Sequence, residues 1–455
     1  MKYMICDPQR LQNCIDFIHG LPLDKGYYVT ISNKKVRSNP QNNLWHDWID
    51  LMAKEAGATP EQQQYMNAAE NWLSANLRKE SGAVISPSEM AQEYKKYAYV
   101  FPTNTTTTWS YNENNGLVAS NYLVETEIME GTNSSILQGL LPHQWDHLAS
   151  GSMSPNGYTY SSVRGELKML DGNSFMVENT FKGILPTLPY LNNYSNGFSP
   201  SDLDTKIAQI ENDALATWTD SYNEGQVMNR LIQTARIADQ MGNIDARDKM
   251  IATVKERLED WLTYESGEVA FLFYYNDDWS AMLGYPAGHG QDSNLNDHHF
   301  HWGYFIHAAA FMEQFEPGWK DQWGDMIHLL IRDAASTDRN DDKFPFLRSF
   351  SPYAGHSWAN GFASFPQGND QESTSESMQF SSSLIHWGTI TNNDEIRDLG
   401  IYLYTTEQTA IEEYWFDVNE RNFASTQQYS LVSRVWGNSY DNGTFWTSDI
   451  AASYG

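Results

Sequence analysis

Cysteine and basic residues are scarce in this 455-residue chain. It holds only two cysteines, Cys6 and Cys14, which are too few for a disulfide scaffold or a four-cysteine metal site. One short bridge between them is an alternative to two ordinary thiols, and the thiols fit the pattern better. The chain has 29 Lys and Arg residues against 58 Asp and Glu residues, so its formal net charge is −29. Most of such a surface repels a polyanion, which argues against nucleic acid as the partner of the whole chain.

Long apolar runs and phosphate-binding loops are missing as well. No stretch approaches the 18 or so consecutive apolar residues of a membrane span, so none is expected. The opening residues, MKYMICDPQRLQNCIDF, lack the uninterrupted apolar core of a signal peptide, so export by that route is not expected. The glycine-rich GYPAGHG lacks the Lys-Ser/Thr pair of a phosphate-binding loop.

Aromatic residues, by contrast, are abundant. They make up 14% of the chain, with 16 Trp and 26 Tyr, within a hydrophobic share of 40%. The length and this share predict two or three domains, each able to bury a sizeable core. Core packing explains part of the aromatic content. Sugar-binding proteins also use exposed rings, because a flat ring covers the C–H face of a pyranose.

The N-terminal residues differ in charge from the rest. Residues 1–60 are nearly balanced whereas the remainder is strongly acidic, which predicts a boundary near residue 60. Residues 27–38 predict a strand running into a basic turn, and residues 41–57 predict a helix that Gly57 ends. The polar, helix-prone residues 61–98 predict a helical linker.

Residues 99–200 alternate polar and apolar side chains, a pattern typical of strands. The stretches 117–129 and 158–170 each predict one strand, and Asp171-Gly172 predicts a hairpin turn. This segment is therefore expected to form an antiparallel sheet packed on itself.

Residues 201–455 change to a helical period. Within 224–243 an apolar stripe recurs at helical spacing, made of Val227, Met228, Leu231, Ile232, Ala235 and Ala238. Further helices are predicted at 199–218, 245–264, 299–315, 319–336, 372–388 and 394–416. Long helices joined by long, Gly- and aromatic-rich loops favour a ring of helical hairpins over a simple bundle.

An acidic residue opens one of these helices, in NLNDHHFHWGYFIHAAAFMEQF (294–315). Asp297 has two interpretations that do not exclude each other. Aspartate is favoured just before a helix because its carboxylate accepts backbone N–H bonds. Alternatively it is an acid at the rim of a cleft, surrounded by His298, His299, His301, Trp302 and Tyr304.

The histidines of this stretch raise a metal hypothesis. His299-Phe300-His301 is the kind of H-x-H pair that some hydrolases use for zinc. Such a site needs further ligands, and no H-E-x-x-H occurs in the chain. Hydrogen-bonding histidines in a polar cleft are therefore favoured, and no metal is expected.

A second acidic stretch, SPYAGHSWANGFASFPQGNDQESTSESMQF (351–380), holds Asp370, Glu372 and Glu376. A helix starting near Gln371 would place the two glutamates four residues apart on one face. The simpler interpretation of such a pair is a solvated acidic surface. Against a plain surface, no Lys or Arg occurs between Arg348 and Arg397. Ring side chains also flank the acids: Tyr353, His356, Trp358, Phe362 and Phe365. Carboxylates without cations beside aromatic walls tend to have raised pKa values, as acid/base catalysis requires.

Two acid-bearing loops among aromatic residues suit glycoside hydrolysis. One carboxyl group protonates the leaving oxygen, and the other activates water or attacks the sugar. The segments NDHHFHWGYFIHAAA, SPYAGHSWANGF and GNDQESTSESM closely resemble signature segments of glycoside hydrolase family 81, the endo-β-1,3-glucanases. So do WSYNENNGLVASNYLVETEIMEGTNSS, LLPHQW, SSVRGELKMLDGNSF, GILPTLPYL and VWGNSYDNGTFWTSDIAASYG. The resemblance covers about residues 70–455.

The resemblance implies a mainly α fold with β. A partial antiparallel β-sandwich and linking region at 99–200 would precede an (α/α)6 toroid catalytic domain at 201–455. It also implies an inverting cleavage of internal β-1,3 bonds in glucans such as laminarin, curdlan or cell-wall glucan, without cofactor or metal. By position, Asp297 matches the general acid, Glu376 the general base and Glu372 an assisting carboxylate, and the choice between the two glutamates stays open. The substrate-binding side chains implied are His301, Tyr304, His356, Trp358 and Tyr353.

Departures from the family pattern leave two other hypotheses. Family members are usually extracellular or in the cell wall, and have a longer sandwich and a toroid that continues past Gly455. A chain truncated in this way could bind β-1,3-glucan without cleaving it. Residues 1–60 resemble the start of a NinB-type phage recombination protein, which would bind single-stranded DNA through Lys34, Lys35 and Arg37 unless these form a solvated turn. A monomer that does not contact membranes is expected.

Overall fold

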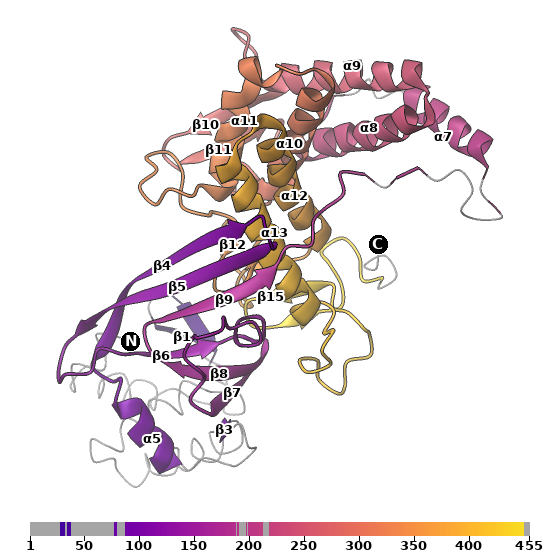
Figure 1. Cartoon of the computed structure of the whole chain (residues 1–455). Helices are drawn as coiled ribbons and strands as arrows, with labels where there is room; N and C mark the ends of the chain where they lie inside the picture. The colour runs from indigo at the N-terminus through magenta and orange to yellow at the C-terminus, as the bar shows by residue number, and fades with distance from the viewer. Residues whose placement is uncertain are drawn as a thin grey trace. The chain divides into compact units, whose positions relative to one another are not determined.

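The computed structural model describes residues 87–187, 189–190, 197, 199–212 and 218–449, together with three short strands at 28–31, 34–37 and 77–79. The chain divides into two compact units (Figure 1). The first contains residues 1–108 and 121–177, and the second contains residues 109–120 and 178–455. The helix predicted at 41–57 and the two cysteines lie outside the described residues.

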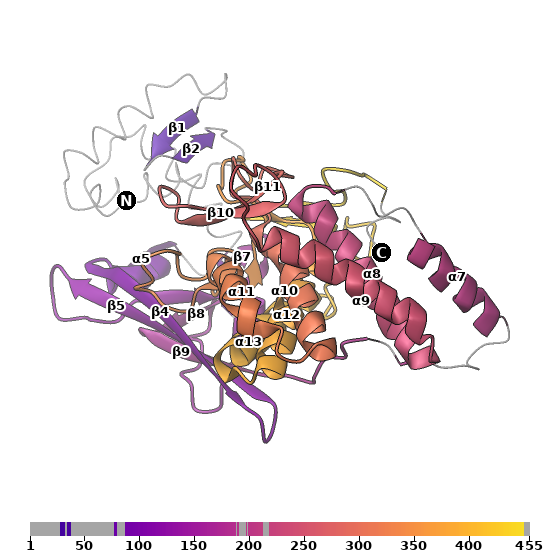
Figure 2. The same ribbon diagram turned by 90° about the horizontal axis from the view of Figure 1, so that it is seen from above.

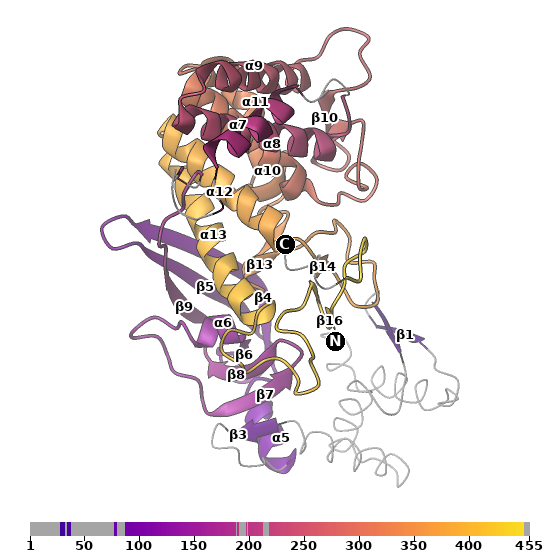
Figure 3. The same cartoon turned by 90° about the vertical axis from the view of Figure 1, so that its right-hand side faces the viewer.

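Antiparallel strands dominate the described part of the first unit (Figure 3). A four-stranded sheet has the order β3-β7-β8-β6, from β3 (Leu77–Lys79), β6 (Leu137–Leu140), β7 (Tyr158–Ser162) and β8 (Gly165–Asp171). The apolar cluster of the first unit consists of Tyr122, Leu140, Leu170, Phe175 and Val177. The helices described here are α5 (Pro87–Lys95) and α6 (Pro142–Trp145). The described part of residues 61–98 contains both β3 and α5, so the segment predicted as a helical linker includes a short strand.

The N-terminal strand prediction is half right. Strands β1 (Tyr28–Ile31) and β2 (Lys34–Arg37) pair as an antiparallel hairpin. The basic residues that were expected in a turn therefore lie in the second strand, and the turn comes before them.

A three-stranded sheet has the order β4-β5-β9, from β4 (Val100–Asn112), β5 (Leu117–Ile128) and β9 (Ser174–Thr180). Strand β5 confirms the strand predicted at 117–129. The single strand predicted at 158–170 is wrong, because β7 and β8 pair there as a hairpin. The hairpin predicted at Asp171-Gly172 is also wrong, because β8 and β9 on either side of it belong to different sheets. Gly172 has a φ of +139°, a conformation that favours glycine and lets the chain change sheets.

Long helices dominate the second unit (Figure 2). The helices predicted from 199 onward are confirmed within three residues at each end, except that the first, predicted at 199–218, is described only as far as Asn212. They are α7 (Pro200–Asn212), α8 (Ser221–Met241), α9 (Ile244–Trp261), α10 (His298–Phe315), α11 (Lys320–Ala335), α12 (Thr374–Thr391) and α13 (Asp394–Tyr414). Consecutive helices pack as the pairs α8–α9, α10–α11 and α12–α13, and α10 also packs against α8 and α12.

Helix α10 is the centre of this unit because it is buried on every side along most of its length. Trp302, Phe305 and Phe311 have no exposed surface, and the helix is buried from His298 to Glu313. The stripe predicted on α8 faces the same core: Met228, Leu231, Ile232, Ala235 and Ala238 are buried, and Val227 packs at its margin.

Short strands in the second unit hold the loops between these helices. They are the hairpin β10 (Leu272–Asn276) with β11 (Ala281–Tyr285), the pair β12 (Phe350–Ser351) with β13 (His356–Ser357), and the sheet β14-β15-β16. The last consists of β14 (Asp370–Gln371), β15 (Arg434–Trp436) and β16 (Tyr440–Asp441). In the described part of the chain, no helix combines the length and the apolar character needed to cross a bilayer.

Candidate active site

Asp297 occupies the N-cap position of α10 but does not cap it. Its side chain accepts no hydrogen bond from the helix N-terminus, and its φ of +60° lies in the left-handed region. Such a conformation is unfavourable for a residue with a Cβ and costs about 1–3 kcal/mol. The backbone is held there because the Asp297 N–H donates to the Ala359 carbonyl at 2.8 Å. The carboxylate is therefore left available for another task, which favours the functional interpretation over the capping one.

The residue after Asp297 anchors the start of the helix. His298 Nδ1 lies 2.6 Å from Asp333 Oδ2, and Trp302 Nε1 donates to the same oxygen at 2.7 Å. Asp333 is fully buried, and the charge of His298 helps to lower its pKa against the effect of burial. This polar anchor fixes the position from which Asp297 projects.

Glu376 lies in the first turn of α12 and is oriented from two sides. The Tyr304 hydroxyl of α10 donates to Glu376 Oε1 at 2.6 Å, and the Ser373 hydroxyl donates to Oε2 at 2.7 Å. The packing of α8 against α10 holds Tyr304 itself, because a Cβ on Gly225 would come within 2.5 Å of the Tyr304 Cβ. A glycine is needed at that contact for the tyrosine to reach Glu376.

Glu372 lies outside the helix, contrary to the sequence prediction. Helix α12 begins at Thr374, and Asp370 and Gln371 form strand β14, so the two glutamates do not share a helical face. Glu372 Oε2 accepts from the Phe445 N–H at 3.3 Å. Burial raises the pKa of Glu372, while Phe445 and Arg434 act in the opposite direction.

Arg434 of β15 supplies a cation that sequence spacing concealed. Its Nη1 lies 3.9 Å from Asp370 Oδ2 and 4.0 Å from Glu372 Oε2, and its Nη2 donates to Asp441 at 2.8 Å. Asp370 has no exposed surface, and burial raises its pKa to about 6 although Arg434 opposes the shift. These carboxylates have no cation close in the sequence, but the expectation that they lack a nearby cation is wrong, because the fold brings Arg434 to them.

The four carboxyl groups influence one another. Burial, and after it the charges of Glu372, Glu376 and Asp370, raise the pKa of Asp297 well above its usual range. Asp297 and Asp370 are also joined through the backbone, since the Ala359 N–H donates to the Asp370 carbonyl at 2.7 Å while the Ala359 carbonyl accepts from Asp297. A carboxyl group whose pKa is raised by burial and by neighbouring carboxyl groups is a suitable proton donor.

A buried network supports the segment that carries both glutamates. Glu407 of α13 accepts from the Ser357 N–H at 2.9 Å, the Ser357 hydroxyl at 2.8 Å and the Ser377 hydroxyl at 2.6 Å. Gln371 donates to the same Ser357 hydroxyl. Because Glu407 is 1% exposed and burial raises its pKa, these donors stabilise a carboxyl group that would otherwise be costly to bury.

The histidines of α10 do not converge. His301 Nδ1 lies 2.7 Å from the Ser221 hydroxyl, whereas both nitrogens of His299 are buried without a hydrogen-bond partner. Residues two apart on a helix point to different faces, so the H-x-H pair cannot chelate one ion. Among the described residues, no group of three or more His, Cys, Asp or Glu has the geometry of a metal site.

The side chains predicted to bind substrate lie at different depths. His301 and His356 have no exposed surface and Tyr304 is 6% exposed, so these three lie behind the surface. The His356 ring packs edge-on against Trp358 at 4.5 Å and Trp415 at 5.1 Å. Tyr353 is half exposed, and Trp358 is partly buried.

Several residues of this site were missed at the sequence level. Asp370 was noted without a role, while Arg434, Phe445 and Glu407 were not singled out. One signal existed for Arg434, because it is the only Lys or Arg after Arg421. Its distance of more than 60 residues from Asp370 and Glu372 hid the contact.

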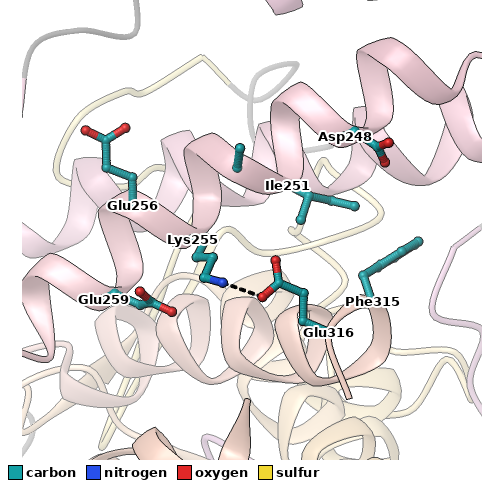
Figure 4. Close-up of a pocket in the computed structure, with 8 residues that line it drawn as sticks. Asp248, Ile251, Lys255, Glu256, Glu259, Phe315 and Glu316 are labelled. Carbon is teal, nitrogen blue, oxygen red and sulfur yellow. Dashed lines mark hydrogen bonds and ion pairs between the residues drawn. The ribbon is translucent and has the colours of Figure 1, made fainter. Parts of the chain in front are cut away.

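A separate groove lies along α9 and the C-terminal end of α10 (Figure 4). Its volume is about 430 Å³, and it is lined by Asp248, Ile251, Ala252, Lys255, Glu256, Glu259, Phe315 and Glu316. Lys255 and Glu316 form an ion pair across it. The groove lies at the opposite end of α10 from Asp297 and contains none of the predicted site residues.

Comparison with known proteins identifies the family. The model described as the glycosyl hydrolase family 81 C-terminal domain matches residues 201–455. A glucan endo-1,3-beta-D-glucosidase from Acetivibrio thermocellus is 44% identical over 365 residues, which cover 80% of this chain and 46% of that protein. A glucan endo-1,3-beta-D-glucosidase from Thermobifida fusca is 37% identical over 377 residues, covering 82% of this chain and 49% of that protein.

Structural comparison agrees. A solved glycoside hydrolase family 81 protein from Clostridium thermocellum matches with a TM-score of 0.77 at 42% identity, over 81% of this chain and 51% of that one. The chain thus spans about half the length of the curated relatives it matches. The resemblance of residues 1–60 to a NinB-type protein is not borne out by these matches. The resemblance of the acidic motifs is confirmed, and this chain belongs to glycosyl hydrolase family 81.

Proposed function

We propose that this chain is an endo-1,3-β-glucanase that cleaves laminarin- or curdlan-type glucans with inversion at the anomeric carbon. Asp297 is the general acid, Glu376 is the general base, and Glu372 is an assisting carboxylate. The names and matched length of the relatives support the activity. The chain acts as a monomer, and a glucan rather than DNA is its partner, since its net charge is −29.

The observation that carries this proposal is the difference between the surroundings of the Asp297 and Glu376 carboxyl groups. Burial and the charges of three neighbouring carboxyl groups raise the pKa of Asp297 well above its usual range, which favours the protonated form that a proton donor needs. Glu376 accepts hydrogen bonds from two hydroxyl groups, those of Tyr304 and Ser373, which fix the orientation of its carboxyl group. A carboxyl group that favours its proton and a second carboxyl group held in a fixed orientation suit acid/base glycoside hydrolysis.

The reaction then follows a single displacement. Asp297 donates its proton to the glycosidic oxygen as the bond from that oxygen to the anomeric carbon breaks. A water molecule adds to the anomeric carbon and transfers a proton to Glu376. Glu372 faces Arg434 and Phe445, and its negative charge favours the protonated form of Asp297.

The architecture that fits this reaction is an (α/α)6 toroid over 201–455 preceded by a partial β-sandwich over 99–200, with 61–98 as a linker after the segment 1–60. The pairs α8–α9, α10–α11 and α12–α13 support a ring of helical hairpins. The antiparallel sheets of the first unit support the sandwich.

Hydrolysis of laminarin, followed by a reducing-sugar assay and by NMR of the newly formed anomer, tests the proposal. Asp297→Asn and Glu376→Gln should each lower kcat by about 100-fold or more while curdlan pull-down persists. Glu256→Gln, in the separate groove of α9, is the matched control and should leave kcat unchanged. Glu372→Gln distinguishes the two glutamates, because the base is the one whose loss is rescued by azide.

Three results would refute parts of this proposal. Full activity of the Asp297→Asn protein would remove the general acid, and a retained anomer would replace the single displacement by a covalent route. Curdlan binding by a wild-type chain that releases no reducing sugar would favour a glucan-binding protein without catalysis.

A further inference from the structure

Phe445 is an exposed aromatic ring that the structure holds rigidly. It is 60% exposed, yet the Arg434 guanidinium carbon lies 4.0 Å from its centroid. Trp436 meets the ring edge-on at 6.0 Å, and Phe365 packs at 5.9 Å. With a guanidinium behind one face and two rings at its sides, Phe445 presents its opposite face to solvent in a single orientation.

This ring lies directly beside the acidic cluster. The Phe445 N–H donates to Glu372 Oε2 at 3.3 Å, and Arg434, which backs the ring, lies 4.0 Å from the same oxygen. The next residue, Trp446, is 68% exposed. Phe365 and Phe445, which we call the aromatic platform, lie 5.9 Å apart and form an apolar surface that begins next to Glu372, and exposed Trp446 follows Phe445 in the chain.

Exposed rings in such a place need an explanation. Leaving large aromatic side chains in water forgoes the stabilisation that burial provides, and contiguous apolar patches usually mark binding sites. The backing guanidinium is itself buried, since Arg434 is 8% exposed and is further held by Asp441. The chain thus uses a buried cation to support an exposed ring.

We propose that the aromatic platform is a glucosyl-binding subsite next to Glu372, with Phe445 stacking on one pyranose ring of the glucan. A β-glucosyl unit carries its hydroxyl groups equatorially, so its two faces expose C–H groups that pack on a flat ring. Because Phe445 is already immobilised, binding costs little side-chain entropy. The subsite rests on the proposed glucanase function and deepens it, since it places one glucosyl unit of the chain.

The test measures binding without turnover. Laminarihexaose is titrated calorimetrically into the full chain carrying Asp297→Asn, alone and combined with substitutions of Phe445. Phe445→Ala should weaken binding about tenfold, equivalent to about 1.4 kcal/mol. Phe445→Leu should weaken it similarly because leucine is apolar but not flat, whereas Phe445→Trp should bind as tightly as phenylalanine.

The control is Phe416→Ala, which removes a comparably exposed phenylalanine (47%) at the end of α13 and should leave affinity unchanged. In the chain with Asp297 intact, Phe445→Ala should raise KM for laminarin with little change in kcat. Near-ultraviolet circular dichroism checks that the packing of the aromatic side chains, Trp436 included, is retained in each variant.

The outcomes separate the two proposals. Active wild-type enzyme with hexaose affinity that does not depend on residue 445 overturns the subsite and leaves the glucanase function standing. Equal weakening by Phe445→Trp and Phe445→Ala also overturns it, because stacking would then not be the cause. A wild-type chain that neither binds nor cleaves the hexaose overturns both. Concentration-dependent dimerisation that Phe445→Ala abolishes, without any change in hexaose affinity, would instead assign the platform to a contact between copies of the chain.

Discussion

Replacing Arg434 by methionine should move the acidic limb of the pH–rate profile to higher pH. Arg434 lies 4.0 Å from Glu372 and 3.9 Å from Asp370, and its charge lowers the pKa of both carboxyl groups against the effect of burial. Methionine retains much of the side-chain length and its contact with Trp436 and Phe445 while removing the charge. The variant therefore tests the electrostatic contribution of this residue.

The size of the expected pH shift follows from the distance between Arg434 and the two carboxyl groups. Two unit charges about 4 Å apart interact with about 4 kcal/mol at the effective dielectric typical near a protein surface. Glu372 is 25% exposed and Arg434 also pairs with Asp441, so solvent and the second partner reduce this value. A remaining effect of about 1.4–2.8 kcal/mol corresponds to a displacement of about 1–2 pH units.

The direction in which the acidic limb moves depends on which protonation state of Glu372 the reaction needs. Without Arg434 the pKa of Glu372 and that of Asp370 rise further, so a larger fraction of each is protonated in weakly acidic solution. If ionised Glu372 assists the reaction, activity declines at a higher pH than in the wild type. The basic limb should not move, because it reports loss of the Asp297 proton and Arg434 is not among the groups that shift the pKa of Asp297.

The assay is the pH dependence of kcat/KM for laminarin between about pH 4 and pH 9. Arg434→Lys should restore part of the acidic limb, since a charge returns without the planar guanidinium. Arg421→Met is the control, because Arg421 pairs with Glu413, which is not one of the carboxyl groups of the site. An unmoved acidic limb in Arg434→Met, or a basic limb that moves instead, would refute the assigned electrostatic role.

Three further predictions concern stability. Asp297→Asn should raise the melting temperature at pH 7 by the equivalent of about 0.5–2 kcal/mol, because burial and like charges disfavour the ionised carboxylate in the folded state. The gain should vanish near pH 3, below the carboxyl group's ordinary pKa, and equal melting of both proteins at pH 7 would contradict it. Ser377→Ala removes a 2.6 Å hydrogen bond to buried Glu407 and should lower the free energy of unfolding in urea by about 1–3 kcal/mol. The control is Ser382→Ala, at a partly buried position of the same helix. Phe305→Ala should cost about 3–5 kcal/mol, since Phe305 is fully buried and packs at 5.0 Å from Phe273 and 5.4 Å from Trp261; a loss below 1 kcal/mol would mean that the core refills the space.

Local pattern predicted the helices well and the strands less well. Helices α8 to α13 satisfy their backbone hydrogen bonds within each segment, so an apolar stripe at helical spacing is enough to locate them. Strand pairing is not local. The hairpin of β7 with β8, and the change of sheet after Asp171, depend on partners such as β6 and β5 that no short pattern identifies.

The sequence by itself determined the family, through its ordered acidic and aromatic motifs, and it identified Asp297, Glu372 and Glu376 as the residues to watch. Only the tertiary structure decided what surrounds them. Tyr304 donates a hydrogen bond to Glu376 from 72 residues away in the sequence, and Phe445 donates one to Glu372 from 73 residues away. Arg434 supplies the cation that the neighbouring sequence lacks. The physical reason is that a carboxyl group's protonation depends on burial and on charges within a few ångströms, and residues far apart in the chain supply both only after the helices have packed.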